Sequence, residues 1–383
     1  MDNPFNKILG SLKSGFAKRS QSVVGIDIGS SFVKVVQLKK KGGRAVLETY
    51  GELALGPIAG LEVGRMTNLS AEKVAQAVAD IFREANVTTK ESAIAIPLSG
   101  SLISFVEIPY LVEKQLQEII PIEARKYIPV PISEVTLDWW IIPKFDSATT
   151  EVSESEKSSI TAGARVQKAD VLIAAIHNEV LMKLKSVATL NSLNAGFFEI
   201  EVFSTVRSTF GHDLVPTMLF DMGAGMTKLS IVERGIMQSS HIINRGSQDI
   251  TMNISNSLGV SSSRAEELKR LYGLSQTETE EGKVVAEISS TVLEYVFSEA
   301  NRILLNYERK YNKTVSKVIL IGGGVLLKGF KEAAEKNLEA EVLYGDPFAK
   351  VEAPAFLTDV LKEAGPEFAV AIGLALRRLQ ELD

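Results

Sequence analysis

The chain has no cysteine among its 383 residues and only three histidines. Without a thiol there is no disulfide, no thiolate zinc site and no cysteine nucleophile, and this composition fits a reducing compartment. His177, His212 and His241 show neither metal-ligand spacing nor the context of a catalytic triad, so we expect structural roles for them. No apolar run reaches the ~18 residues that span a bilayer, and no signal-peptide core is visible. Any membrane attachment is therefore expected to be peripheral or through a partner.

Positive charge is also scarce. Lys and Arg number 42 against 47 Asp and Glu, which gives a net charge of −5 and a pI near 5.6. No basic stripe stands out beyond the N-terminus, so a nucleic-acid surface is not expected. Residues 1–22 are the exception, because apolar side chains at helical spacing among lysines predict a short basic amphipathic helix. This extension would either contact an anionic membrane surface transiently or remain a tail on the body.

The most informative stretch is the first apolar run, residues 23–38, VVGIDIGSSFVKVVQL. A β-branched strand leads to Asp27, a Gly-Ser-Ser turn follows, and a second β-branched run can return as the hairpin partner. Gly29 lets the turn bring backbone N–H groups close to an anion, and the two turn serines add hydroxyl donors. Asp27 can hold a hydrated divalent metal, and Lys34 can reach back to a phosphate. The run predicts a phosphate-binding hairpin; the alternative is an ordinary glycine-containing hairpin with a surface lysine.

The pattern recurs further along the chain. Residues 219–232, LFDMGAGMTKLSIV, again contain an apolar strand, an Asp, a Gly-rich turn, a Thr and a returning β-branched strand. A third glycine turn, in residues 318–330 (VILIGGGVLLKGF), joins a buried-looking strand to a helix without a carboxylate, which suits a nucleoside better than a metal. Two hairpins of one kind predict a duplicated α/β fold, and a chain of this length can form more than one lobe.

These three turns, in this order, resemble the two phosphate loops and the adenosine loop of the actin, Hsp70 and sugar-kinase superfamily. Within it the chain most resembles the actin-like bacterial FtsA and PilM families, over nearly its whole length from Val23. The resemblance implies an actin-like ATPase fold of two ribonuclease H-like lobes, with ATP or ADP between them and Mg²⁺ held through water by Asp27 and Asp221. The residues that it assigns to the cofactor are Asp27, Gly29, Ser30, Ser31, Lys34, Asp221, Gly223, Ala224, Gly225, Thr227, Glu266, Lys269, Gly322, Gly323 and Gly324.

Two other positions are carried over from the same resemblance. Glu201 falls where the family has a glutamate on a connecting helix that faces the γ-phosphate, and Glu199 is the neighbouring candidate. A carboxylate there could orient a water or a hydrated metal, so Glu201 is the candidate catalytic residue, with a solvent-facing helix cap as the alternative. Glu266 and Lys269 lie three apart on one helix face, where relatives line the ribose and adenine; an ordinary surface ion pair is the alternative.

The most distinctive stretch outside the three turns is residues 113–143. A helix, a proline-rigid exit at 127–131 (YIPVP) and a strand follow one another, which resembles the extra subdomain of the PilM family; a plain helix-to-strand connection is the alternative. Trp139 and Trp140 alternate on this strand, so one of them points outward as a candidate contact. Residues 146–170, rich in Ser, Thr and Glu, predict a long hairpin tip.

The closing segment contains small residues, Ala371, Gly373 and Ala375, that would allow a helix to pack closely beside the hinge. The expected order of domains is an extension at 1–22, the first lobe at 23–91, an inserted FtsA- or PilM-type subdomain at 92–177, the first lobe continued with its connecting helix at 178–215, the second lobe at 216–362 with a nucleotide-binding subdomain at about 250–314, and a closing helix at 363–383 that returns to the first lobe.

The resemblance implies a cytoplasmic, ATP-binding scaffold of the type IV pilus assembly complex, associated with the inner membrane through a partner. That partner would be the N-terminal peptide of a single-span membrane protein like PilN, bound in a groove beside the inserted subdomain, with other pilus components nearby. Ala224 stands where actin has an acidic residue, which favours slow turnover. The alternatives are a sugar or metabolite kinase, for which no acceptor motif with an aspartate base is apparent, and an FtsA-like filament former. The hydrolysis rate and a homo-oligomeric state stay open.

Overall fold

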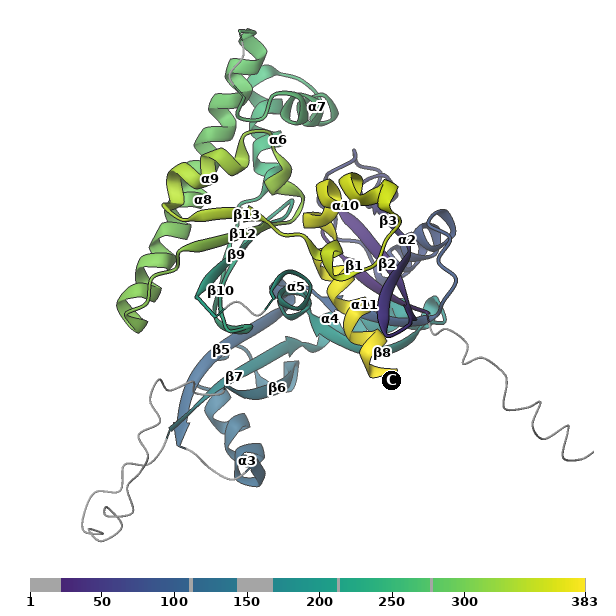
Figure 1. Cartoon of the computed structure of the whole chain (residues 1–383), viewed down its shortest axis with the longest axis vertical. Coiled ribbons are helices and arrows are strands. Elements are labelled where there is room, and N and C mark those ends of the chain that lie inside the picture. Colours follow the sequence, from purple (N-terminus) through teal and green to yellow (C-terminus); the bar gives the residue numbers. More distant parts are fainter. Residues whose placement is uncertain (1–21, 110–112, 143–167, 212–213, 276–277, 383) are drawn as a thin grey trace, which may run out of the picture.

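The computed structural model describes residues 22–109, 113–142, 168–211, 214–275 and 278–382. The predicted amphipathic helix, apart from Ser22, lies outside these ranges, as do most of the predicted hairpin tip and His212. Figure 1 shows two lobes, each built on a sheet, and a smaller third sheet beneath them.

The first lobe is built on a mixed sheet whose two central hairpin strands come from the first apolar run. β1 and β2 pair antiparallel, so that Asp27 and Lys34 lie opposite each other, and β1, β4 and β8 run parallel. α2 packs with α4 over β2 and β3, and α2 begins where Ser70 accepts a hydrogen bond from the Lys73 N–H. In sheet order the strands are β3 (Arg44–Ala54), β2 (Phe32–Lys41), β1 (Ser22–Ile28), β4 (Glu91–Ile96) and β8 (Asn194–Ile200), and the helices are α2 (Ala71–Glu84), α4 (Asn178–Leu190) and α5 (Glu201–Thr209).

The second lobe repeats this topology strand for strand, which confirms the predicted duplication. Its hairpin places Asp221 opposite Lys228. The long helix α8 begins at Glu280, because Thr279 caps it and carboxylates are favoured at a helix N-terminus. In sheet order the strands are β11 (Ile236–Ile243), β10 (Thr227–Glu233), β9 (Thr217–Met222), β12 (Lys317–Ile321) and β13 (Glu341–Tyr344), and the helices are α6 (Ser247–Leu258), α7 (Ser262–Tyr272), α8 (Glu280–Tyr311) and α9 (Phe330–Leu338).

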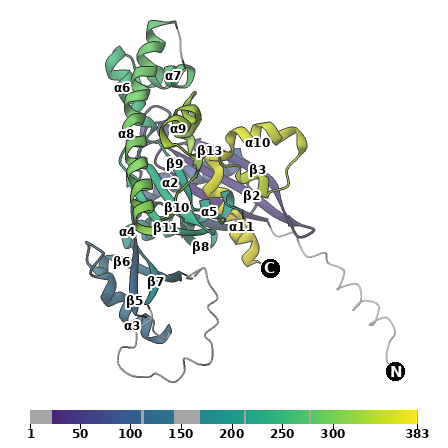
Figure 2. The same cartoon turned by 60° about the vertical axis from the view of Figure 1, so that its left-hand side comes forward.

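The inserted subdomain is a three-stranded antiparallel sheet in the order β5 (Ser101–Pro109), β7 (Lys168–His177), β6 (Val135–Ile142), with α3 (Glu113–Ala124) on one face. It lies at the opposite end of the molecule from α6 and α7 (Figure 2). β4, which the sequence placed at the start of this subdomain, belongs to the first lobe instead. Its residues are buried on both faces, as expected of a central parallel strand, so the inserted sheet begins at Ser101.

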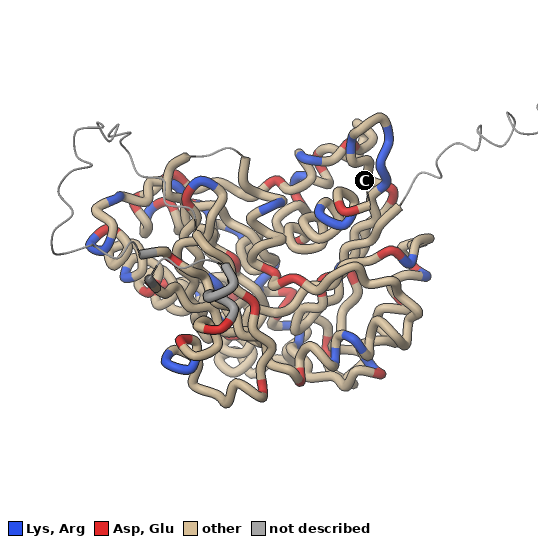
Figure 3. Tube along the Cα trace, turned by 90° about the horizontal axis from the view of Figure 1, so that it is seen from below, with Lys and Arg blue, Asp and Glu red and all other residues tan. Residues whose placement is uncertain are grey.

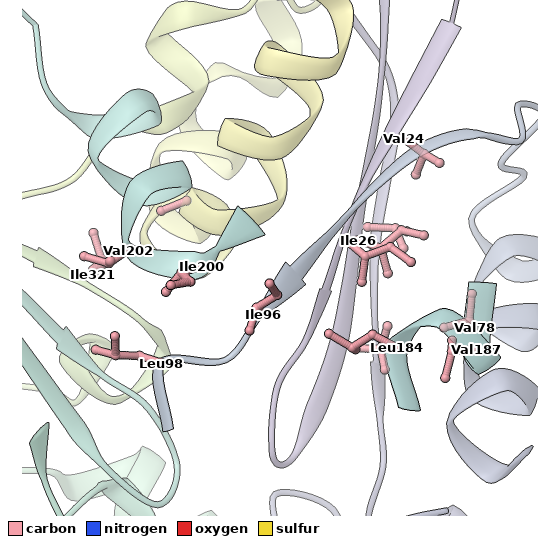
Figure 4. Packing of buried hydrophobic residues seen from close by; sticks show 14 of the residues in the cluster. Val24, Ile26, Val78, Ile96, Leu98, Leu184, Val187, Ile200, Val202 and Ile321 are labelled. Carbon is pink, nitrogen blue, oxygen red and sulfur yellow. The ribbon is translucent and has the colours of Figure 1, made fainter. Parts of the chain in front are cut away.

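A closing helix, α11 (Ala369–Glu381), follows the short helix α10 (Thr358–Ala364) and returns to the first lobe, where it packs on β1 and α5. The close contact of α11 with β1 and α5 requires glycine at two positions. A Cβ on Gly25 would overlap the carbonyl oxygen of Ala371, and one on Gly373 would overlap the carbonyl oxygen of Ser204. The predicted close packing of the small residues is thereby confirmed. Figure 4 shows the apolar core nearby, with Ile200 and Val202 of the β8–α5 junction beside Ile321 of β12.

Charged residues of both signs are interspersed along the described chain (Figure 3). Among the described helices, none combines the length and the apolar character that crossing a membrane requires.

Gly373→Ala tests the closing contact. The added methyl group has to push α11 away from the α5 backbone, so we expect a loss of about 1–3 kcal/mol in the free energy of unfolding, as for other overpacked sites. Gly211→Ala is the matched control, because a Cβ there meets nothing within 4 Å. Urea denaturation of both variants would measure the difference, and equal stability would show that α11 does not need the glycine.

Candidate functional site

A cavity of about 570 Å³ lies between the two lobes and brings the three predicted turns together. Of the residues assigned to the cofactor, Thr227 does not line it: Thr227 is buried, and its hydroxyl donates a hydrogen bond to the Arg245 carbonyl oxygen at 2.9 Å. The predicted residues that line the cavity are Asp27, Gly29, Ser30, Ser31, Lys34, Glu201, Asp221, Gly223, Ala224, Gly225, Glu266, Lys269, Gly322, Gly323 and Gly324.

The two hairpin turns have the same internal geometry. The Gly29 N–H donates to the Phe32 carbonyl at 2.9 Å, and the Gly223 N–H donates to the Met226 carbonyl at 2.9 Å. The second turn is also held on α6, because the Ser247 N–H donates to the Gly223 carbonyl at 3.0 Å. Both turns therefore present a fixed backbone to the cavity from opposite lobes.

The third turn requires glycine at its first position. Gly322 has a φ of +84°, and a Cβ there would lie 2.6 Å from the Asp221 Oδ1 atom. Its N–H donates to the Pro366 carbonyl at 2.9 Å, which ties the turn to the segment that leads into α11. The turn can lie this close to the second hairpin only because it has no side chain at this position.

Lys228 is the central cation of the site, and sequence reasoning missed it. Its Nζ atom lies 2.7 Å from Glu201 Oε2 and 3.0 Å from Asp221 Oδ2. The other Glu201 oxygen accepts the Leu98 N–H at 2.6 Å, so Glu201 is buried rather than a solvent-facing cap. A signal was present in the sequence: Lys228 follows Asp221 by seven residues, as Lys34 follows Asp27.

The electrostatics of this centre follow from three carboxylates in one enclosed space. Burial and the Glu201 carboxylate raise the pKa of Asp27 to about 7. Burial also raises the pKa of Asp221, although Lys228 opposes the shift. Burial lowers the pKa of Lys228, but the carboxylates of Asp221 and Glu201 outweigh it and hold the ammonium in its charged form.

The predicted magnesium site does not fit this arrangement well. Mg²⁺ takes carboxylate oxygens that are open to it, usually one or two of them, and Lys228 already engages the Asp221 carboxylate. Among the described residues, no group of three or more His, Cys, Asp or Glu side chains could hold a metal ion. The cavity therefore has a cation of its own beside Asp221, one of the two carboxylates that the sequence predicted to hold Mg²⁺ through water.

Glu266 and Lys269 form an ion pair of 2.7 Å inside the cavity rather than on the surface. Lys269 Nζ also donates to the Thr251 hydroxyl at 2.9 Å, and that hydroxyl donates to Glu266 at 2.7 Å. Burial raises the pKa of Glu266, but Lys269 and the other hydrogen-bond partners of this carboxylate together have the larger opposite effect. The pKa therefore lies below its ordinary value, and the carboxylate stays ionised. This pair forms a rigid polar wall on the second lobe.

The segment at Met66 and Thr67, which no sequence motif predicted, bridges the two lobes at the cavity. The Thr67 N–H donates to the Ser30 carbonyl of the first lobe at 2.9 Å. One residue earlier, the Met66 N–H donates to Gln248 Oε1 of the second lobe at 2.6 Å. Both bonds use backbone N–H groups, which every non-proline residue has, and the Thr67 hydroxyl adds a second bond to the Ser30 carbonyl at 3.1 Å.

Glu199, the neighbouring candidate, does not line the cavity. Its two oxygens accept from the Arg207 guanidinium at 2.7 Å each, and Arg377 of α11 adds a third contact at 2.7 Å. Although burial raises the pKa of Glu199, these arginines lower it below its ordinary value of 4.5. Glu199 joins β8, α5 and α11 and has a structural role.

The geometry can now be compared with known proteins. Residues 25–379 match the family described as type IV pilus assembly protein PilM. This chain belongs to the PilM family. Its fold is actin-like, and among solved structures it is similar to the PilM in a "PilM-PilN type IV pilus biogenesis complex", with a TM-score of 0.76, 23% identity and coverage of 93% of this chain and 98% of that one.

Two further relatives place the PilM family among actin-like proteins. The cell division protein FtsA of Streptococcus pneumoniae is 23% identical over 375 residues, covering 87% of this chain and 77% of FtsA. The structure of MreB5 of Spiroplasma citri bound to AMPPNP aligns with a TM-score of 0.50 at 10% identity, covering 94% of this chain and 98% of that one. The predicted fold and the predicted family are both confirmed.

Glu199→Gln tests the structural role of this carboxylate. We expect a loss of about 2 kcal/mol in the free energy of unfolding at pH 7, less than for a fully enclosed ion pair because both arginines are partly exposed. Because the pKa is lowered on folding, the contribution is complete above about pH 4.5 and is lost as the pH falls through the folded value.

Urea denaturation at pH 7 and at acid pH would measure both effects. Glu381→Gln is the control, since Glu381 contacts the same Arg377 from an exposed position. A Glu199→Gln variant as stable as the wild type at pH 7 would contradict the assignment.

Proposed function

We propose that this PilM family protein is a nucleotide-loaded, actin-like scaffold of the type IV pilus assembly complex, with ATP or ADP between its lobes. The observation that carries the proposal is the convergence of three glycine turns and the Glu266–Lys269 pair on one cavity of about 570 Å³. The similarity to MreB5 bound to AMPPNP supports a nucleotide in this fold.

The cavity offers a place for each part of a nucleotide. Fixed backbone turns at Gly29 and Gly223 face each other from the two lobes and suit the phosphates, and Lys34 adds a cation on the first lobe. Glu266 and Lys269 offer an ionised acceptor and a donor that suit ribose and adenine. Turnover is expected to be slow, since Ala224 leaves the second turn without a carboxylate that could position a water.

Lys34→Met tests the nucleotide site. The Lys34 Nζ atom has one weak ion pair, at 3.7 Å from Glu367, so it can turn to a phosphate at little cost. We expect a loss of about tenfold or more in ATP affinity, since a charged hydrogen bond contributes ~1.5–3 kcal/mol. Calorimetry would measure it.

Lys39→Met is the matched control, because Lys39 lies on the same strand, pairs with Glu48 and does not line the cavity. Unchanged ATP affinity in the Lys34 variant would contradict the phosphate assignment.

The second part of the proposal concerns the partner, a short N-terminal peptide from a single-span, PilN-like inner-membrane protein. The structural similarity to a PilM–PilN complex supports a partner of this kind. Such a peptide would hold the protein on the cytoplasmic side of the inner membrane. The extension at residues 1–22 would then have only an auxiliary role.

An apolar groove suited to such a peptide lies between the inserted subdomain, α5 and β11, on the face to which the outward tryptophan points. Leu137, Trp139 and Ile141 belong to the core that α3 covers. Trp140, on the opposite face, is 48% exposed and lines a cavity of about 240 Å³ with Phe203 of α5, Ile236 and Met237. β6 is also an edge strand, so an extended peptide can pair with its main chain while apolar side chains enter the groove.

Trp140→Asp tests the groove. We expect at least tenfold weaker binding of a fluorescently labelled N-terminal peptide of the PilN-like partner, measured by polarisation, because an exposed aromatic anchor is replaced by a charge. Phe356→Asp is the control, since Phe356 is 82% exposed and does not line this groove.

Deletion of residues 1–21 should leave the peptide affinity unchanged. Wild-type affinity in the Trp140 variant, or persistent binding after removal of the inserted subdomain from an otherwise folded protein, would place the partner elsewhere.

A further inference from the structure

The acidic centre of the cleft has a built-in cation, and we propose that Lys228 takes the place of a protein-bound divalent metal ion. ATP then binds without a metal held by Asp221 and Glu201. This inference rests on the proposed nucleotide function and adds to it which cationic groups contact the phosphates.

The first argument is that three of the four carboxylate oxygens of Glu201 and Asp221 accept a hydrogen bond. Lys228 Nζ lies within 3.0 Å of both Glu201 Oε2 and Asp221 Oδ2, and the remaining Glu201 oxygen accepts the Leu98 N–H. Magnesium binds such oxygens at about 2.0–2.1 Å. An ion bound directly here would have to displace an ammonium group whose side chain is only 15% exposed. That displacement would leave the ammonium without its partners in an enclosed space, which is strongly unfavourable.

The second argument is the position of Lys228 in the chain. Antiparallel pairing places it directly opposite Asp221, and the same pairing places Lys34 opposite Asp27. The duplicated fold therefore brings one lysine from each lobe to the same cavity. This placement follows from strand register, so it does not depend on a flexible loop.

The third argument is that Lys228 still has an N–H group with which to bind a phosphate. An ammonium group has three N–H donors, and Glu201 and Asp221 use two of them. The third can be donated to a phosphate oxygen. With Lys34 on the other side, two ammonium groups can donate hydrogen bonds to the phosphates without a metal held by the protein.

The test is calorimetric titration of ATP into the full-length protein with Mg²⁺ and with EDTA. We expect the wild-type affinity to change less than about threefold between the two conditions, since the side chain of Lys228 is present in both. In Lys228→Met, the freed carboxylates can accept a hydrated ion. ATP affinity in EDTA should then fall at least about tenfold, and Mg²⁺ should restore part of it.

One further measurement does not depend on ATP affinity, and one further variant serves as a control. Mn²⁺ without nucleotide, followed by electron paramagnetic resonance, should bind Lys228→Met and not the wild type. Lys34→Met is the matched control: it keeps Lys228, so its ATP affinity should fall by the same factor with Mg²⁺ and with EDTA.

The outcomes separate the two proposals. A wild-type protein that loses tenfold or more of its ATP affinity in EDTA, or that binds Mn²⁺ directly, overturns the role of Lys228 alone. That conclusion needs only the wild type and so does not depend on the folding of Lys228→Met. Failure to bind ATP in either condition overturns the nucleotide function, and this inference with it.

Discussion

The site depends on a contact between backbones. α11 packs against β1 and α5 so closely that Gly25 and Gly373 have no room for a side chain. β1 ends beside Asp27, and α5 begins at Glu201, so the helix that closes the fold also fixes the spacing between two of the three central carboxylates. Glu199 strengthens the same junction through Arg207 and Arg377. The acidic centre is thus held by packing and ion pairs that lie outside the cavity.

Duplication explains how one chain builds a two-sided cleft. Each lobe contributes a hairpin with an aspartate at the strand end and a lysine opposite it, so equivalent groups meet across the cavity. The lobes are not chemically equal, however. Asp27 has a pKa near neutrality, whereas Lys228 is bound to two carboxylates, and the first turn has serines where the second has alanine and glycine. A pseudo-symmetric fold therefore produces a site whose two hairpins differ in charge and in hydrogen-bonding groups.

The sequence predicted the features that depend on local pattern. A strand, an aspartate and a glycine turn occur together over a few residues, so both hairpins could be predicted, whereas the meeting of all three turns in one cavity was implied by the family resemblance. Thr227 matched the same pattern but not the site, since its side chain turns toward Arg245.

The features that depend on distant contacts were harder to predict. The role of Lys228 depends on its ion pair with Glu201, which lies in the other lobe. Glu199 and Glu201 are two residues apart, yet the end of β8 and the start of α5 direct them to different surroundings. The segment at Met66 and Thr67 bonds to the two lobes through its peptide N–H groups, which leave no mark on residue type, and through the Thr67 hydroxyl.

The segment at Met66 and Thr67 connects the two sides of the cleft by hydrogen bonds. Met66 is bonded to the second lobe by one side-chain amide at 2.6 Å, and Thr67 is bonded to the first lobe one residue later. A hydrogen bond of this kind is lost once donor and acceptor separate beyond about 3.5 Å, so a lobe displacement of roughly 1 Å at this point is enough to release it. The separation of the lobes at this point is then coupled to the hydrogen bonding of Gln248, so that one amide side chain helps to set how easily the cleft opens.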